Sequence, residues 1–414
     1  MSTDAPSKPK RVNLRRPDIM EEVKAQVLSH YRSDLVDRLR TTGEVTWVSP
    51  PGNQAERMTI KLAKEFGFCY GVERCIDLAY AALKVFPDKP LYILGEIIHN
   101  PEVNDQIRDM GIRFLSGPNK VADIDDLDEN DIVIIPAFST EVDILEKLKN
   151  KGCQFVDTTC GDVMSVWKRV RGYAKEEFTS IIHGKADHEE TRATLSQATA
   201  NNGHYLIVRD LDETELVCEY IIKGGDKGVF LKQFSGSYSK DFDPNQHLQS
   251  VGVANQTTMM RNETEEVQQR IRDAIMRRFG KENVENHFRF FDTICGATQE
   301  RQDALHVMLK KPMDLLLVIG GYNSSNTAHL AEMGESVLPT YFIKNASEMA
   351  DAQRIRHWKQ HTHEAVETRN WLPDDPLTVG VTAGASCPNN LIEEVICRLL
   401  ELRGTSAKEF LSTN

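Results

Sequence analysis

Short, continuously apolar runs alternate with helical patterns along most of this chain, and this rhythm is the feature that most limits its possible folds. The runs at 132–135, 205–208 and 315–319 consist almost entirely of aliphatic residues. Strands that are apolar on both faces are typical of parallel sheets covered by helices. Further strand-like runs lie at 91–98, 155–158, 180–183, 229–234, 251–254 and 377–381. The sequence therefore predicts an α/β architecture with mainly parallel sheets.

The length of 414 residues indicates several domains, because one domain typically takes roughly 150 residues. The N-terminal part has an amphipathic helical pattern at about 19–39 and a turn-rich segment at 49–52. Its expected role is packing or contact between subunits, so a homodimer is possible. We expect an N-terminal extension, three similar α/β domains and a short tail, at 1–58, 59–158, 159–291, 292–403 and 404–414.

Charge and hydropathy exclude several classes of protein. The net charge of -12 argues against a nucleic-acid-binding surface. No apolar stretch approaches the ~20 residues that a membrane helix needs. The N-terminus has no secretory pattern, and the eight cysteines are widely spaced, unlike a disulfide scaffold. We expect a cytoplasmic protein; a plastid location is less favoured because acidic residues lie near the N-terminus.

A short motif containing a cysteine occurs twice, with a looser third copy. Residues 157–161 read DTTCG, residues 292–296 read DTICG, and residues 66–71 read FGFCYG. Each copy places one cysteine between a strand-like run and a helical pattern, where the helix dipole favours a thiolate. Three cysteines from distant segments would leave a fourth metal position open, although buried thiols or a three-cysteine zinc site are alternatives. Core or incidental positions are expected for the other five, Cys75, Cys153, Cys218, Cys387 and Cys397.

Eight short segments carry a further signal when they are taken together and in order. The segments are 67–72, 96–100, 159–160, 188–191, 256–258, 294–299, 323–326 and 382–386. Together they resemble the 4-hydroxy-3-methylbut-2-enyl diphosphate reductase family. The likeness extends over about residues 58–400 and shows features of the plant and cyanobacterial branch.

The resemblance implies a trefoil of three α/β domains around one 4Fe–4S cluster per chain, ligated by Cys69, Cys160 and Cys295. It also implies the last step of the methylerythritol phosphate pathway of isoprenoid biosynthesis. In that reaction the substrate hydroxyl binds the open iron and is removed reductively, which gives isopentenyl and dimethylallyl diphosphate. No nicotinamide-binding fingerprint is present, so the expected electron donor is ferredoxin, flavodoxin or a similar one-electron carrier.

The same resemblance assigns roles to individual side chains. Glu190 is the expected proton donor, because burial can raise a carboxyl pKa toward neutrality. Thr257 is expected to orient the proton path or the substrate hydroxyl. Hydroxyl, amide and imidazole groups are expected around the diphosphate, from His99, His188, Ser324, Ser325, Asn326 and Ser386.

Two positions depart from the best-known bacterial pattern. Phe138 occupies a turn where many members have a phosphate-binding histidine, and Lys185 replaces a second histidine near Glu190. Lys185 is our candidate to bind phosphate in place of the histidine that is missing at position 138. A non-catalytic iron–sulfur sensor is the alternative function, but a sensor needs neither Glu190 nor the polar segment 323–326.

Overall fold

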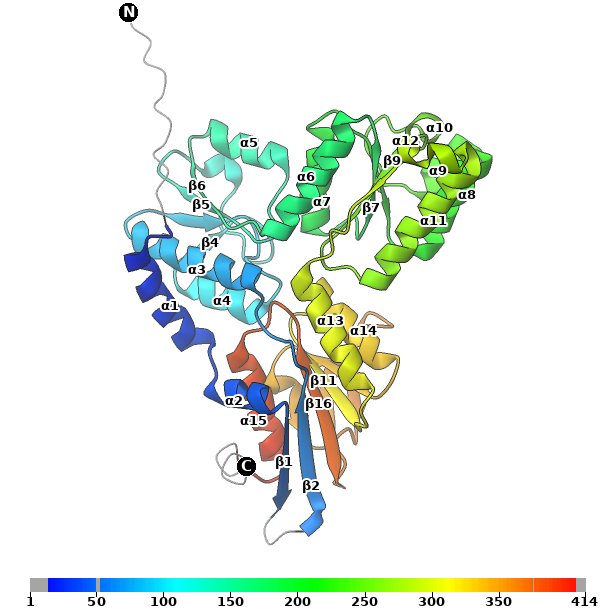
Figure 1. The fold of residues 1–414 in the computed structure, drawn as a ribbon. Helices are drawn as coiled ribbons and strands as arrows, with labels where there is room; N and C mark the ends of the chain where they lie inside the picture. Colours follow the sequence, from blue (N-terminus) through cyan, green and yellow to red (C-terminus); the bar gives the residue numbers. More distant parts are fainter. Residues whose placement is uncertain (1–13, 50–52, 375, 407–414) are drawn as a thin grey trace, which may run out of the picture.

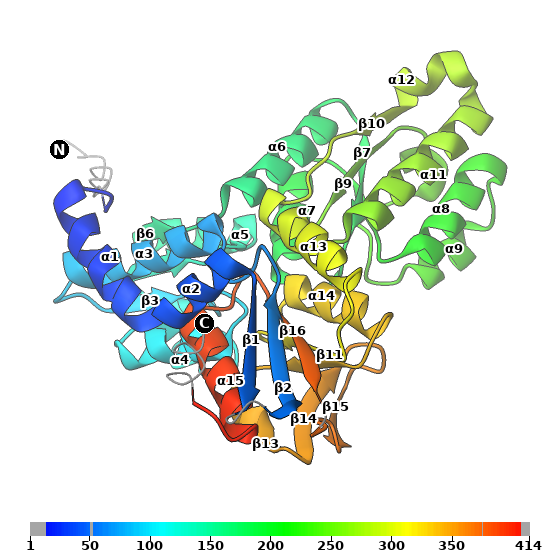
Figure 2. The ribbon, with the colours of Figure 1, turned by 60° about the horizontal axis from the view of Figure 1, so that its bottom comes forward.

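The computed structural model describes residues 14–49, 53–374 and 376–406, and three sheets divide this part of the chain into three lobes (Figure 1). The first and second lobes each contain a four-stranded parallel sheet, and the third contains an eight-stranded mixed sheet. Figure 2 shows the lobes meeting at a common centre. The predicted α/β class with mainly parallel sheets is confirmed.

The first lobe has strand order β4-β3-β5-β6. In β5, Ile132 and Ile134 pack on one side of the sheet, whereas Val133 and Ile135 pack on the other, which explains the uninterrupted apolar run. The strands are β3 (Leu91–Ile93), β4 (Arg113–Phe114), β5 (Ile132–Ile135) and β6 (Gln154–Asp157), and the helices are α3 (Tyr70–Val85), α4 (Pro101–Asp109) and α5 (Val142–Asn150).

The second lobe has strand order β10-β9-β7-β8. Its strands are β7 (Thr179–His183), β8 (Tyr205–Val208), β9 (Val251–Asn255) and β10 (Phe288–Phe290). Its helices are α6 (Gly161–Lys175), α7 (Glu189–Thr199), α8 (Leu211–Lys223), α9 (Lys227–Gln233), α10 (Pro244–His247), α11 (Arg261–Phe279) and α12 (Val284–His287).

The third lobe has strand order β1-β2-β16-β11-β12-β14-β13, with β15 also paired to β14. Alternate residues of β11 face two cores: Leu315 and Leu317 pack toward α15 and α2, and Leu316 and Val318 toward α13 and α14. The strands are β1 (Glu44–Ser49), β2 (Asn53–Leu62), β11 (Leu315–Ile319), β12 (Thr340–Ile343), β13 (Met349–Asp351), β14 (Arg354–Lys359), β15 (Glu364–Arg369) and β16 (Leu377–Ala383), and the helices are α13 (Gly296–Leu309), α14 (Ser325–Glu335) and α15 (Asn389–Leu402).

The N-terminal part differs from the expected extension. The predicted helix at 19–39 is two helices, α1 (Pro17–Tyr31) and α2 (Asp34–Thr42), because Ser33 caps the second by accepting from the Val36 N–H at 2.9 Å. The expected boundary at 58/59 falls inside β2, which pairs in parallel with β16. Residues 44–49 and 53–62 are therefore part of the large sheet.

Two strand predictions were also wrong in type or length. Residues 229–234 fall mainly in helix α9, because Asp226 caps it by accepting from the Val229 N–H at 2.8 Å. Phe230 and Phe234 then share one buried helix face while Val229 is exposed. The run at 91–98 is a strand only at 91–93 and then forms a loop.

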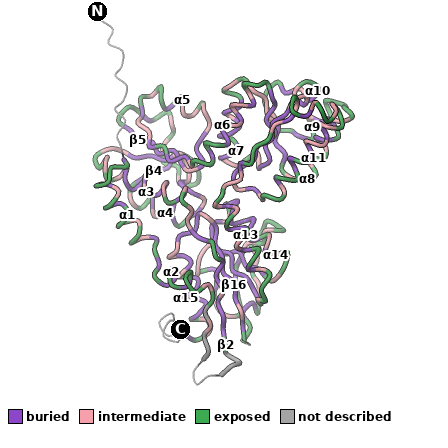
Figure 3. Tube along the Cα trace, in the orientation of Figure 1, coloured by how far each residue is buried: buried purple, intermediate pink, exposed green. Residues whose placement is uncertain are grey.

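Burial follows this layered arrangement (Figure 3). The central strands of each sheet are buried, and the exposed residues lie mainly on outer helix faces and loops. None of the helices in the described ranges is both long enough and apolar enough to cross a membrane.

Candidate active site

Each of the three predicted cysteines stands at the start of a helix. Cys69, Cys160 and Cys295 are the N-cap residues of α3, α6 and α13, which follow β2, β6 and β10. The predicted strand-to-helix turns are therefore confirmed. We call these three residues the cysteine site.

The backbone of each cysteine is held by a turn from another part of the chain. The contacts are alike: each cysteine N–H donates to a carbonyl in the loop that follows a parallel strand. They are Cys69 to Ala385 at 3.2 Å, Cys160 to Ala137 at 2.8 Å, and Cys295 to Thr257 at 3.1 Å. These carbonyls follow β16, β5 and β9, so the edges of all three sheets position the cysteine site.

The cysteine side chains approach one another around Gly71. A Cβ atom at Gly71 would lie 2.8 Å from Cys160 Sγ and 3.8 Å from Cys69 Sγ, so only glycine leaves room here. Cys295 lies close enough to Cys69 and Asp162 for both residues to influence its pKa. All three thiols are free and partly exposed.

The thiol pKa values differ from our expectation. Burial raises the pKa of Cys160, and it raises that of Cys295 to about 12, with Asp162 adding to the rise. Backbone N–H groups at the helix starts act in the opposite direction but do not offset burial. Without a cation these two thiols remain protonated, so a bound metal would have to stabilise their thiolates.

Two arginines that we did not predict hold the cysteine turns together. Arg301, which is 4% exposed, donates to the Gly67 carbonyl at 2.6 Å and to the Ala297 carbonyl at 2.8 Å. Arg74 donates to the carbonyls of Thr158 and Thr159, at 3.0 and 2.9 Å. Neither arginine stands out in one sequence, because both lie within ordinary helical segments.

Glu190 is buried beside Thr257. Its carboxylate accepts from the Thr257 N–H at 2.6 Å and from the Thr257 hydroxyl at 2.9 Å. Burial raises the pKa of Glu190 to about 7, although both bonds favour the charged form. The Thr257 carbonyl also accepts from the Cys295 N–H, so Thr257 connects this carboxyl group to the cysteine site.

His99 and His188 lie together next to Glu190. His99 Nδ1 is 3.0 Å from a Glu96 carboxylate oxygen, and its ring stacks on Phe138 with centroids 4.6 Å apart. His188 Nδ1 accepts from the Glu190 N–H at 3.2 Å, so a neutral His188 carries its proton on Nε2. Burial lowers the pKa of His188 to about 3, which favours this neutral form. The Nε2 atoms of both histidines are buried and lack a hydrogen-bond partner among the described residues, and His99 Nε2 lies 3.8 Å from a Glu189 carboxylate oxygen.

The start of α14 adds further unpaired groups. Asn326 Oδ1 accepts from the Ala385 N–H at 2.8 Å, which leaves Nδ2 buried without a partner among the described residues. The Ser325 hydroxyl is likewise buried and unpaired. Ser324 caps α14, and Ser386 donates to the His99 carbonyl at 3.1 Å. We call the unpaired groups of His99, His188, Ser325 and Asn326 the polar pocket.

The histidine pair also offers a metal-like geometry with Glu189. Ligand atoms of His99, His188 and Glu189 lie within 4.8 Å of one another. However, the neutral His188 tautomer presents an Nε2–H donor to this space, and an N–H donor suits an anion better than a cation. The arrangement therefore favours phosphate oxygens over a metal ion.

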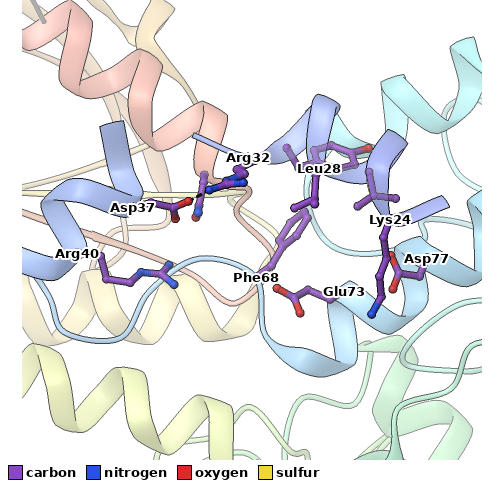
Figure 4. Close-up of a pocket in the computed structure, with 11 residues that line it drawn as sticks. Lys24, Leu28, Arg32, Asp37, Arg40, Phe68, Glu73 and Asp77 are labelled. Atoms are coloured by element: carbon purple, nitrogen blue, oxygen red, sulfur yellow. Dashed lines mark hydrogen bonds and ion pairs between the residues drawn. The ribbon is translucent and has the colours of Figure 1, made fainter. Parts of the chain in front are cut away.

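A separate cavity of about 320 Å³ lies between α1, α2 and α3 (Figure 4). Phe68, Glu73 and Asp77 line it together with residues of the two N-terminal helices. Phe68 precedes Cys69, but no member of the polar pocket reaches this cavity.

A protein-family comparison decides the affiliation. The model of the LytB protein family matches residues 60–400. The chain belongs to the LytB protein family. Curated relatives named 4-hydroxy-3-methylbut-2-enyl diphosphate reductase include one from Gloeobacter violaceus, 45% identical over 92% of this chain and 90% of its own. Another, from Thermosynechococcus vestitus, is 44% identical over 93% of both chains.

Solved structures agree with this affiliation. One neighbour is described as (E)-4-hydroxy-3-methyl-but-2-enyl diphosphate reductase, the terminal enzyme of the non-mevalonate pathway. It is 27% identical, has a TM-score of 0.51, and the match covers 83% of this chain and 99% of that one. The Plasmodium falciparum E-1-hydroxy-2-methyl-but-2-enyl-4-diphosphate reductase shares the fold, with a TM-score of 0.60 at 22% identity over 86% and 97% of the two chains.

Proposed function

We propose that this chain catalyses the reductive dehydroxylation of 4-hydroxy-3-methylbut-2-enyl diphosphate to isopentenyl and dimethylallyl diphosphate, the last step of the methylerythritol phosphate pathway. The observation that carries the proposal is the set of hydrogen bonds made by Thr257. Its N–H and hydroxyl donate to the buried Glu190 carboxylate, and its carbonyl accepts from the Cys295 N–H. A proton donor thus adjoins the thiols that would hold a redox group.

The cysteine site fits a 4Fe–4S cluster with three protein ligands. Cys69, Cys160 and Cys295 are soft donors at helix starts, and Gly71 keeps the space beside two of the sulfurs open. When bound, the cluster would supply electrons one at a time and Lewis acidity at the iron without a protein ligand.

The polar pocket would hold the diphosphate. His188 Nε2–H, Asn326 Nδ2 and the Ser325 hydroxyl are donors that the protein leaves unsatisfied. His99, whose Nε2 atom is also buried without a hydrogen-bond partner among the described residues, would lie beside the same phosphate oxygens. Buried unpaired donors are costly in an empty site, so phosphate oxygens offer the compensation. Ser324 and Ser386 would complete this cradle, and Lys185 would add a cation.

Glu190 would supply a proton as the hydroxyl leaves. Removal of the hydroxyl as water consumes two electrons and two protons. A carboxyl group with a pKa of about 7 is still substantially protonated near neutral pH, and Thr257 keeps it directed at the site. Ferredoxin or flavodoxin would deliver the electrons.

An anaerobic assay tests this function. Protein purified without oxygen is mixed with a chemically reduced dye and the hydroxylated diphosphate, and the two product diphosphates are measured. We expect turnover that requires the cluster. Protein that carries an intact 4Fe–4S cluster but forms neither product would disprove the proposal and support the sensor alternative. A colourless zinc protein would contradict the cluster itself.

A further inference from the structure

The cysteine site lies close to the surface on one side. The residue after each cysteine is exposed: Tyr70 by 78%, and Gly161 and Gly296 also in the exposed class. By contrast, Glu190 and Thr257 are 3% and 5% exposed. An external electron therefore has its shortest route to the cysteine site through the starts of α3, α6 and α13, and not through the polar pocket.

Large apolar side chains are exposed on and beside helix α6. Met164, one turn after Cys160, is 41% exposed, and Phe291 is 39% exposed. The Arg169 guanidinium lies 3.6 Å from the centre of the Phe291 ring, which places Phe291 next to α6. Exposed aromatic and methionine side chains beside an arginine are typical of protein interfaces.

Helix α6 carries a net positive charge, opposite in sign to that of the whole chain. Helix α6 contains one acidic residue, Asp162, and four basic ones, Lys168, Arg169, Arg171 and Lys175, whereas the chain carries -12. Lys168 and Lys175 are exposed, and no carboxylate of the described residues lies within ion-pair distance of either. Lys168 lies about 10 Å from Gly161 along the helix axis, at 1.5 Å per residue. Figure 2 shows α6 running outward from the junction of the lobes.

We propose that Tyr70, Met164, Lys168 and Phe291 form a docking face for a small acidic protein that carries one electron. This inference rests on the proposed function, which needs two electrons per turnover. Each docked carrier is oxidised by one electron, so two carriers are used for each water released. Positive charge steers the acidic carrier, and the apolar side chains form the centre of a short-lived contact.

The test compares two electron sources in the holoenzyme. Turnover is measured with an acidic, reduced 2Fe–2S ferredoxin and, separately, with reduced methyl viologen. We expect Lys168→Glu to raise the KM for ferredoxin about five- to tenfold at low salt, with a smaller effect at high salt. Viologen-driven turnover should stay unchanged. Met164→Ser should also raise the ferredoxin KM without changing its salt dependence.

Lys232→Glu is the matched control, because Lys232 is an exposed lysine on α9, away from the start of α6 (Figure 1). Equal effects of Lys168→Glu and Lys232→Glu on the ferredoxin KM would overturn the docking face. So would a change in oligomeric state caused by Lys168→Glu, because the surface would then contact a second copy of the chain. Wild-type protein that fails with viologen would instead count against the proposed function.

Discussion

The cysteine site and the polar pocket are adjacent but are constructed in different ways. All three cysteines follow one scheme, a helix N-cap whose N–H bonds to a carbonyl after a parallel strand. The polar pocket has no repeated scheme. It combines two histidines from loops of different lobes with a serine and an asparagine at the start of α14, and each of the four has a buried polar atom without a hydrogen-bond partner in the described structure.

The two regions differ in hydrogen bonding: polar groups of the cysteine turns have partners within the protein, whereas those of the polar pocket are available to a ligand. The cysteine turns are secured within the protein by main-chain hydrogen bonds and by Arg74 and Arg301. The unpaired donors of the polar pocket cost stability until an anion binds. Substitutions should therefore affect cofactor retention in one region and substrate affinity in the other.

The largest effect is expected at the cysteine site. Cys160→Ser should release the cluster and lower turnover by more than about 100-fold, because even outer-shell changes at metal sites cost about 10- to 100-fold. Iron content and the visible absorption spectrum measure the loss. Cys397→Ser, which alters a cysteine at the edge of the large-sheet core, should retain both iron and activity. Full iron content in Cys160→Ser would break the distinction between the two regions.

Glu190→Gln should keep the cluster but lower kcat by about 10²- to 10⁴-fold, the usual contribution of a general acid. In the wild type, kcat should fall as the pH rises through about 7, because Glu190 then loses its proton. The variant should lack this step in its pH–rate profile. An unchanged profile would exclude Glu190 as the proton donor.

The same carboxyl group gives a stability prediction of known sign. The pKa of Glu190 in the folded protein lies above the ordinary value of 4.5. Between pH 4.5 and about 7, the folded protein therefore retains a proton that the unfolded chain has released. The free energy of unfolding should decrease as the pH rises through this window. Glu190→Gln should remove that contribution, as denaturant titrations at several pH values would measure.

Two neighbouring serines at the start of α14 distinguish a ligand-binding hydroxyl from one that also stabilises the helix. Ser325→Ala removes a buried hydroxyl that has no partner in the described structure, so it should raise the substrate KM about tenfold without lowering the Tm. Ser324→Ala should also lower stability by about 1 kcal/mol, because it removes the N-cap of α14. A Tm loss in Ser325→Ala would mean that this hydroxyl is already satisfied.

The smallest effect is expected at Lys185. Its charge lies near His188 and Glu332, at the edge of the polar pocket. Lys185→Ala should raise the substrate KM about two- to fivefold, the range for a solvated charge, and this increase should be smaller at high salt. Unchanged substrate affinity would refute the idea that Lys185 binds phosphate in place of a histidine at position 138.

Phe138 illustrates what a motif comparison misses. From the sequence it counts only as a missing histidine, but in the structure its ring supports the His99 ring at an interplanar angle of 6°. Where many family members have a histidine that can donate a hydrogen bond, this chain has an aromatic ring that orients His99. Similarly, Arg301 is an ordinary helix residue until folding brings it 2.6 Å from the Gly67 carbonyl, 234 positions away in the chain.

The sequence alone determined the α/β class, most of the buried strands and the three helix-capping cysteines. These features depend on a few neighbouring residues, whose alternation and capping pattern are local. Only the tertiary structure decided the pKa of Glu190, the unpaired donors of the polar pocket, the inclusion of β2 in the large sheet and the helical state of α9. Burial, charge and hydrogen-bond completion depend on segments that are far apart in the chain and meet only where the strand ends of the three lobes converge.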